Sequence, residues 1–250
     1  MKAIYVAWQD PESRSWLPVG RLSQVDNVYR FVYTKGAEER SNFVPFARMT
    51  KLEAVYESNE LFPIFANRLL PKSRPEYKEY LDWLNLSDTQ TSPLSILSIS
   101  GGSRATDSLE VFACPEPNNQ GKYEVCFFNH GLSHLPGMAI HRVSELRVGE
   151  RLFLMADIQN QQDRLAIALR TGDPATIVGY CPRYLTEDFN RLLKEFVPDE
   201  IEVSAEKINI DAPIQLRLLC KIVCQWPKNF EPCSSEPYRP IVQTVDLCSR

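Results

Sequence analysis

The sequence predicts a β-rich α+β protein, and three observations lead to that prediction. Short runs of β-branched and aromatic residues recur along the chain, separated by turns rich in Pro, Gly and Asn. Apolar residues at helical spacing occur in only a few segments. The composition, 44% apolar and 24% charged over 250 residues, is that of a globular protein with room for one large domain or two smaller ones.

The first half begins with three predicted strands. Residues 3–8 and 19–22 are apolar runs separated by a polar segment with proline, and residues 27–33 alternate apolar and polar side chains. We interpret these runs as an antiparallel meander. In residues 61–84 apolar side chains repeat at helical spacing and Pro71 breaks the pattern, which predicts two helices with a kinked junction. Further strands are expected at residues 94–99, 108–114 and 123–129.

The second half alternates short strands with one amphipathic helix. Strands are expected at residues 151–155, and at residues 165–169 and 175–178 as a hairpin. A helix is expected at residues 184–196, where Thr186, Glu187 and Asp188 suit a helix start. Short strands around one helix suggest a small barrel. The remaining strands are expected at residues 201–203 and 214–224, and the chain from residue 225 on is irregular, leaving open whether it completes the barrel.

Bulk properties limit the location and the partners. The net charge of −4 does not indicate a nucleic-acid or membrane partner, although a chain with a nearly balanced net charge can still have a basic face. No apolar run approaches the ~20 residues of a membrane span, and the N-terminal residues do not resemble a signal peptide. We therefore expect a cytoplasmic protein with no membrane partner. The seven cysteines include no Cys-x-x-Cys pair, so free buried thiols are expected.

The motifs of the common enzyme classes are missing. The chain has no nucleophile-elbow GxSxG, no Walker loop, no dinucleotide fingerprint and no kinase catalytic loop. His130 and His134 lie four residues apart in one loop. This spacing would place both side chains on the same side only if the segment were a helix, and Gly131 and Pro136 argue against a helix there. We expect a protein that is not an enzyme and needs no cofactor or metal. An enzyme that uses this histidine loop or the cysteines remains an alternative.

A dense polar cluster precedes the hairpin of the second half. Asn160-Gln161-Gln162-Asp163 stands directly before the strand at residues 165–169, and the hairpin leads into the turn Gly179-Tyr180-Cys181-Pro182. Over residues 138–193 this order resembles the HIRAN domain, whose pattern has an Asn-Pro-x-Asp knot, an Ala-Ile strand and a Gly-Tyr-hydrophobic-Pro turn before a helix. The matching residues are Asn160, Asp163, Ala166, Ile167, Gly179, Tyr180 and Pro182.

This resemblance implies an OB-like barrel that holds the 3′ end of single-stranded DNA. By position, Asp163 would accept a hydrogen bond from the terminal hydroxyl, Asn160 would brace the loop, and Arg183 or Arg142 would contact phosphate. Gln162 stands where the family has a stacking aromatic, so an amide replaces a ring in contact with the base. Tyr180 also belongs to the implied nucleic-acid site. In the alternative interpretation Asn160 and Asp163 only cap a turn and Tyr180 only packs in the core.

The first half resembles another family. Val19-Gly20-Arg21-Leu22, the strand at residues 29–33 and the run Phe65-Ala66-Asn67-Arg68-Leu69-Leu70-Pro71 are similar to the N-terminal subdomain of HipA-type toxin kinases, over residues 2–114. The resemblance implies a small α/β module that packs against a kinase or acts as an antitoxin. The kinase lobe of that family has no counterpart in these residues.

Together the two resemblances predict a HipA-like module at residues 1–125, an OB-like HIRAN barrel with one helix at residues 126–230 and an irregular tail at residues 231–250. The expected function is a non-enzymatic adaptor that binds single-stranded or 3′-end-containing DNA and a protein partner such as a kinase, nuclease or helicase. DNA repair, defence against viruses and other mobile DNA, or a toxin–antitoxin operon would suit it. The alternative is a protein-interaction subunit or antitoxin that has lost DNA binding.

Overall fold

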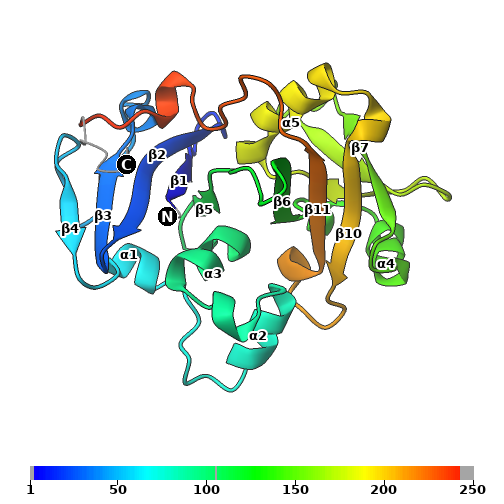
Figure 1. The fold of residues 1–250 in the computed structure, drawn as a ribbon, viewed down its shortest axis with the longest axis horizontal. Helices are drawn as coiled ribbons and strands as arrows, with labels where there is room; N and C mark the ends of the chain where they lie inside the picture. The colour runs from blue at the N-terminus through cyan, green and yellow to red at the C-terminus, as the bar shows by residue number, and fades with distance from the viewer. Residues whose placement is uncertain (1–2, 105, 243–250) are drawn as a thin grey trace. The chain divides into compact units, whose positions relative to one another are not determined.

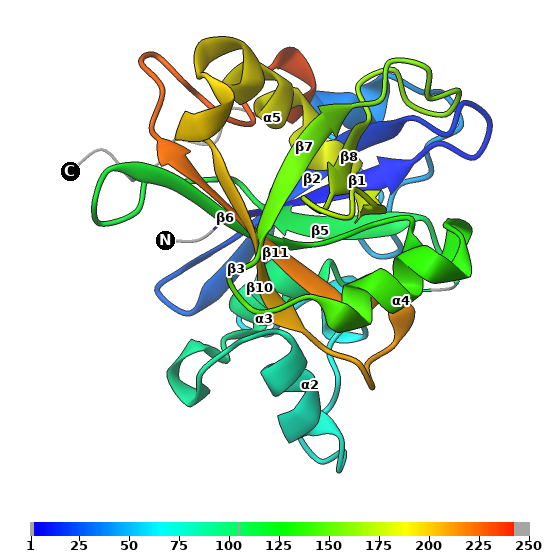
Figure 2. The same ribbon diagram turned by 90° about the vertical axis from the view of Figure 1, so that its right-hand side faces the viewer.

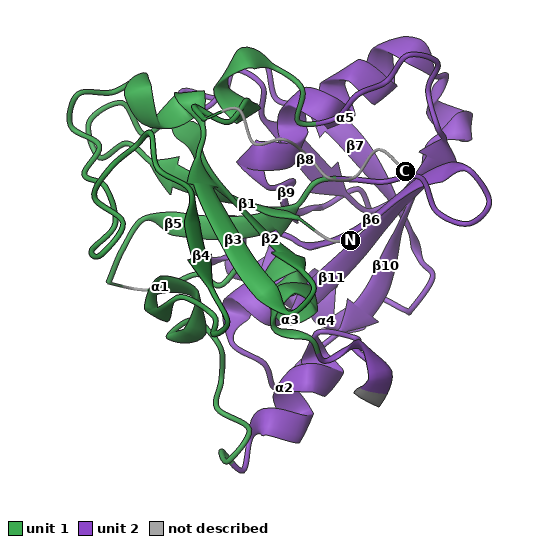
Figure 3. Cartoon of the chain, turned by 60° about the vertical axis from the view of Figure 1, so that its left-hand side comes forward, with its two compact units in different colours: residues 1–74, 92–114, 233–250 green, residues 75–91, 115–232 purple. Residues whose placement is uncertain are grey.

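The strands of the described residues form two antiparallel β-sheets (Figure 1). The computed structural model describes residues 3–104 and 106–242, and these fall into two compact units. Unit 1 contains residues 1–74, 92–114 and 233–250, and unit 2 contains residues 75–91 and 115–232 (Figure 3). Each unit therefore combines segments that are distant in the sequence.

The sheet of unit 1 has five strands in the order β4-β3-β2-β1-β5. The predicted meander of the first three strands is confirmed, since β1 pairs with β2 and β2 with β3, all antiparallel. The strands are β1 (Ile4–Gln9), β2 (Trp16–Val25), β3 (Val28–Tyr33), β4 (Tyr56–Ser58) and β5 (Leu109–Ala113).

An aromatic core fills unit 1 around Tyr33. Its ring packs edge-on against Phe31 and is fully buried. Its hydroxyl donates to the Met49 carbonyl at 2.7 Å and accepts from the Phe46 N–H at 2.7 Å. Burial raises the pKa of Tyr33 to about 12, so the hydroxyl stays protonated and both hydrogen bonds persist at any physiological pH. The aromatic strand residues of this half are thus packing residues.

The predicted strand at residues 94–99 is wrong, because these residues form helix α3 (Pro93–Ser100). The Ser92 side chain accepts the Ser95 N–H at 3.1 Å, Pro93 occupies the first helical position, and Gly101 ends the helix in the left-handed conformation. These start and stop signals outweigh the β preference of a short Leu- and Ile-containing run. The two helices predicted before it are present as α1 (Pro63–Ala66), which is a single turn, and α2 (Tyr77–Trp83).

The described part of the C-terminal tail returns to unit 1. Thr34 and Pro240 form an isolated β-bridge, and the Ile241 N–H donates to the Tyr33 carbonyl at 3.0 Å. Tyr238 packs edge-on against Tyr5 of β1, with 5.2 Å between the ring centroids. The described part of the tail is therefore attached at the end of β3 and does not complete the second sheet. Its last residues, 243–250, which include Cys248, lie outside the described residues.

Unit 2 is built on a curled sheet of six strands in the order β6-β11-β10-β7-β8-β9. The two edges of this sheet approach each other, because His130, just after β6, bridges Tyr180 of β9 through hydrogen bonds of 2.8 and 2.9 Å. The predicted barrel-like β fold is confirmed in this form. The strands are β6 (Lys122–Phe128), β7 (Arg151–Ala156), β8 (Ile167–Arg170), β9 (Ile177–Tyr180), β10 (Glu202–Ile208) and β11 (Leu218–Gln225).

Two helices, α4 (Gly137–Glu145) and α5 (Arg183–Glu195), lie at opposite ends of this sheet (Figure 2). The expected helix of the second half is confirmed as α5, which buries Leu185, Phe189 and Leu192 in the core of the sheet. Helix α4 is a correction to the prediction of one helix, since it begins directly after Pro136 and is too short for a clear periodic pattern. Among the residues that the structure describes, no helix has both the length and the apolarity to cross a membrane.

Candidate functional site

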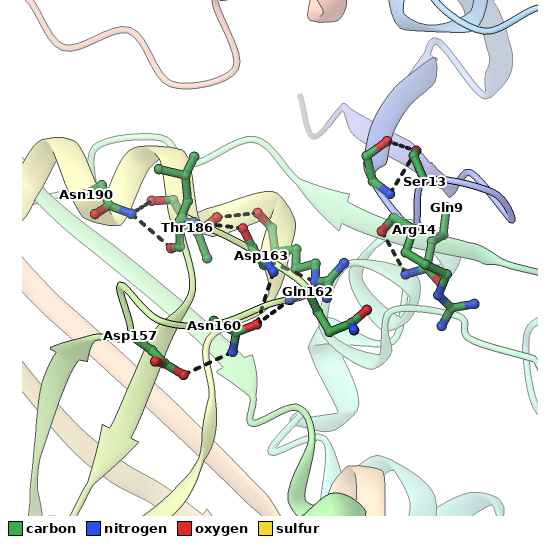
Figure 4. A network of polar contacts seen from close by, with 12 residues as sticks. Gln9, Ser13, Arg14, Asp157, Asn160, Gln162, Asp163, Thr186 and Asn190 are labelled. Atoms are coloured by element: carbon green, nitrogen blue, oxygen red, sulfur yellow. Dashed lines mark hydrogen bonds and ion pairs between the residues drawn. The ribbon is translucent and has the colours of Figure 1, made fainter.

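The loop that joins β7 to β8 folds around Asn160 (Figure 4). The Asn160 amide donates to the Asp157 carboxylate at 3.0 Å. Its carbonyl oxygen accepts the N–H groups of Gln162 and Asp163, both at 3.0 Å. One side chain therefore ties three other residues into a compact turn, as the resemblance implied for Asn160. We call residues 157–165 the polar knot.

Asp163 closes the polar knot and also reaches its surface. One carboxylate oxygen accepts the Leu165 N–H at 2.9 Å, and the other lies 3.7 Å from Nε of Arg183, the first residue of α5. The side chains of Asp163 and Arg183 are 18% and 29% exposed. The carboxylate is thus held by the fold and still partly exposed, with a guanidinium beside it. Turn capping and ligand binding are compatible at this residue.

Tyr180 connects the polar knot to the edge of the sheet. Its hydroxyl donates to the Asp157 carboxylate at 3.1 Å, while its backbone pairs with that of His130. Burial, and then the neighbouring Asp157 carboxylate, raise the pKa of Tyr180, so it acts as a hydrogen-bond donor. From α5, the Asn190 amide donates to the Leu165 carbonyl at 3.2 Å. The fold therefore brings Asn160, Asp163, Tyr180 and Arg183 together, and it adds two residues that the sequence did not single out, Asp157 and Asn190.

Gly179 allows Tyr180 to take this position. Its φ is +145°, a backbone conformation that residues other than glycine rarely adopt. A Cβ atom there would lie 2.5 Å from the Asn129 amide nitrogen and 3.0 Å from the His130 carbonyl oxygen. The buried Asn129 amide in turn donates to the Val178 carbonyl at 2.6 Å. The glycine of the Gly-Tyr turn is therefore required by the close approach of the two sheet edges.

Arg142 and Gln162 differ in their surroundings from the other predicted site residues. Arg142, on α4, forms an ion pair with the Glu150 carboxylate, which also accepts the Arg147 N–H at 3.0 Å. Because this charge is neutralised within unit 2, a phosphate contact of Arg142 remains a prediction. The Gln162 side chain is exposed. Apolar residues flank it, with Ile158 83% and Leu165 51% exposed.

Replacing Asn160 by alanine should loosen the polar knot without unfolding the sheet. The variant removes one donor and the acceptor of two backbone N–H groups, so we expect a loss of about 1–2 kcal/mol in unfolding free energy. Hydrogen exchange should show lost protection at the Gln162 and Asp163 amides, with little change in β8. Gln161→Ala, an exposed neighbour, is the matched control and should leave both measurements unchanged. Equal exchange in the two variants would contradict the bracing role of Asn160.

Comparison with known families identifies the second sheet. The family model of the HIRAN domain matches residues 122–227. The match begins at the first residue of β6 and ends just after β11, so it spans the whole six-stranded sheet and both of its helices. A HIRAN domain is therefore found in this part of the chain, over a longer stretch than the residues 138–193 that carried the resemblance.

No curated protein matches the chain. Among solved structures, the crystal structure of a protein from Lactobacillus plantarum, a northeast structural genomics consortium target, covers 42% of this chain and 100% of its own. The identity is 19% and the TM-score is 0.33. Nothing in these comparisons supports the resemblance of residues 2–114 to a HipA-type subdomain, which remains a prediction.

Proposed function

We propose that the HIRAN domain binds single-stranded DNA at its 3′ end through the polar knot, and that the chain is a non-enzymatic adaptor. The observation that carries the proposal is the pair Asp163 and Arg183, which the fold fixes and leaves partly exposed, in a HIRAN domain, a family that suggests DNA binding. The hydrogen bonds of Asn160 and Tyr180 hold this pair in place before any ligand arrives, which lowers the entropic cost of binding.

The chemistry of Asp163 and Arg183 is suited to binding the 3′ end of a DNA strand. A carboxylate accepts a hydrogen bond from a free hydroxyl and repels a phosphate, so Asp163 selects a terminus that ends in a hydroxyl. The oxygen of Asp163 that faces Arg183 retains lone pairs for this hydroxyl, since the Leu165 N–H occupies the other oxygen. The guanidinium of Arg183 can bind the nearest backbone phosphate. For the base, the proposal relies on the exposed Gln162 amide and on the apolar surface of Ile158 and Leu165.

A binding experiment with matched oligonucleotides tests this proposal. Labelled single strands of one sequence, ending in a 3′-hydroxyl or a 3′-phosphate, are titrated with the full chain. We expect the hydroxyl form to bind roughly 10-fold or more tightly, because the phosphate meets the Asp163 carboxylate. Asp163→Asn should remove this preference, and Arg183→Gln should weaken binding of both strands.

The control is Arg164→Gln, which removes an exposed charge within the knot, at the residue after Asp163. It should leave the end preference intact. Equal binding of the two strands by the unaltered protein would exclude end recognition. An unchanged preference in Asp163→Asn would exclude the role of that carboxylate.

For unit 1 we propose a protein-binding role, supported by the residue pattern that resembles HipA-type subdomains. A kinase, nuclease or helicase would be the partner, in DNA repair, mobile-element defence or a toxin–antitoxin operon. The second candidate for the whole chain is a protein-interaction subunit or antitoxin without DNA binding, and two observations favour it: Gln162 in place of an aromatic and the net charge of −4. Co-purification of a partner with no retention of either oligonucleotide would favour this second candidate.

A further inference from the structure

On the outer face of β7 and β8, the aromatic ring of Phe153 is contacted by the guanidinium groups of Arg151 and Arg170. Arg170 of β8 stands opposite Phe153 of β7 in the antiparallel register. The Cζ atom of Arg170 lies 4.6 Å from the centroid of the Phe153 ring, and that of Arg151 lies 5.2 Å from it. Such cation–π contacts hold the two charges on a partly exposed aromatic surface. We call Arg151, Phe153 and Arg170 the arginine–phenylalanine cluster.

This cluster lies on the same side of the sheet as the base of the polar knot. Side chains alternate along a strand, so Arg151, Phe153 and Met155 share one face of β7, and Asp157 continues that face where it enters the knot. Leu152, on the opposite face, belongs to the core of unit 2. Four residues of extended strand separate Asp157 from Phe153, a distance of about 13 Å. A strand whose end sits at the knot can therefore reach the cluster within a few nucleotides.

The two charges of the cluster are available to a ligand. Arg151 has an acidic neighbour, Asp199 at 3.2 Å, in a pair whose side chains are 47% and 92% exposed. Exposed ion pairs of this kind contribute little to stability, so another anion can readily replace Asp199 beside Arg151. Arg170 donates to the backbone carbonyl of Thr171 at 2.9 Å and retains further N–H groups. Guanidinium groups bind phosphate through paired N–H donors and offer flat faces on which bases stack.

We infer that the arginine–phenylalanine cluster binds backbone phosphates of the single strand whose 3′ end lies in the polar knot. The inference rests on the proposed function and extends it from recognition of the terminus to a track that reads strand length. Phe153 acts as a positioning residue, since its ring fixes the orientation of both arginines.

Binding of short and long strands tests the track. A dinucleotide, too short to reach the cluster from the knot, and an oligonucleotide several times longer, both with 3′-hydroxyls, are titrated with the full chain at several salt concentrations. The double variant Arg151→Gln with Arg170→Gln should lose roughly 10- to 100-fold in affinity for the long strand only. Its salt dependence should become shallower by about 0.7 per arginine. Phe153→Leu, which keeps an apolar side chain, should give a smaller loss for the long strand, and Lys194→Gln on α5 is the charge control.

The outcomes separate this inference from the proposed function. Suppose that the double variant keeps the affinity and the salt slope of the unaltered protein while Asp163→Asn loses the end preference. The binding of DNA by the cluster is then wrong, and the recognition of the 3′ end by the polar knot is supported. If the unaltered protein binds neither strand, both are overturned. An acidic peptide is titrated in parallel. If the double variant loses the binding of this peptide and none of the binding of DNA, the cluster serves a protein partner and the inference is wrong.

Discussion

Replacing Gly179 by alanine is expected to destabilise unit 2 by about 2–4 kcal/mol, because the backbone there tolerates no side chain. The added Cβ would meet the Asn129 side chain at 2.5 and 2.9 Å and the His130 carbonyl at 3.0 Å. Neither neighbour can move freely. Asn129 is buried and bonded to the Val178 carbonyl, and the His130 carbonyl accepts the Tyr180 N–H at 2.9 Å. Relief of the clash would therefore break the bridge that joins the two edges of the sheet.

Denaturant unfolding measures this effect, and hydrogen exchange of β8 and β9 localises it. The control is Gly137→Ala, at the start of α4, where a Cβ would meet no atom within 4 Å. Its unfolding free energy should change by less than about 0.5 kcal/mol. If Gly179→Ala unfolds at the same denaturant concentration as the control variant, the tight approach at this position is wrong.

The contribution of Asp188 to stability should fall as the pH rises from about 4 to about 7. This residue lies on the buried side of α5, beside Phe189 and Leu192. Burial, and then the charge of Glu187, raise the pKa of Asp188 from 3.8 to about 7. Between these two values the folded chain holds a proton that the unfolded chain has released. Each step up in pH in this window therefore favours unfolding, and above pH 7 the ionised buried carboxylate costs roughly 2–4 kcal/mol.

Asp188→Asn should abolish this contribution. We expect the variant to be more stable than the unaltered protein at pH 8, with the advantage shrinking towards pH 4. Unfolding free energies measured across this range give the difference directly. Glu195→Gln, an exposed carboxylate at the end of the same helix, is the control and should leave the pH profile unchanged. A parallel profile for Asp188→Asn would show that the carboxyl is not the group responsible.

Local pattern predicted most elements correctly, and its failures have identifiable causes. The meander of the first sheet, the hairpin of β8 and β9 and helix α5 follow from alternation, turn residues and helical spacing. The strand expected at residues 94–99 failed because the capping residues Ser92 and Gly101 decided the conformation. Helix α4 was missed because, at nine residues, it is too short for a clear periodic pattern.

The candidate site was only partly predictable. The order of Asn160, Asp163 and the Gly-Tyr turn marked the polar knot, and the structure joins these residues by hydrogen bonds. Asp157 as the partner of Tyr180 could not be predicted, because no local rule links residues 23 positions apart. The arginine–phenylalanine cluster could not be predicted for a related reason. The register of β7 and β8 had to be known before Arg170 could be placed opposite Phe153.

The sequence by itself determined the β-rich class, the barrel-like second half and the place of Asn160 and Asp163 before the hairpin, because these depend on short-range periodicity and turn chemistry. Only the tertiary structure decided which distant segments share a unit. Residues 75–91 pack with the second sheet, and the tail returns to Tyr33 and Thr34. The edge-to-edge bridge of His130 and Tyr180 belongs to the same group of features. Such pairings depend on which buried surfaces and free backbone groups find each other across the chain, and the physical chemistry of neighbouring residues does not contain that information.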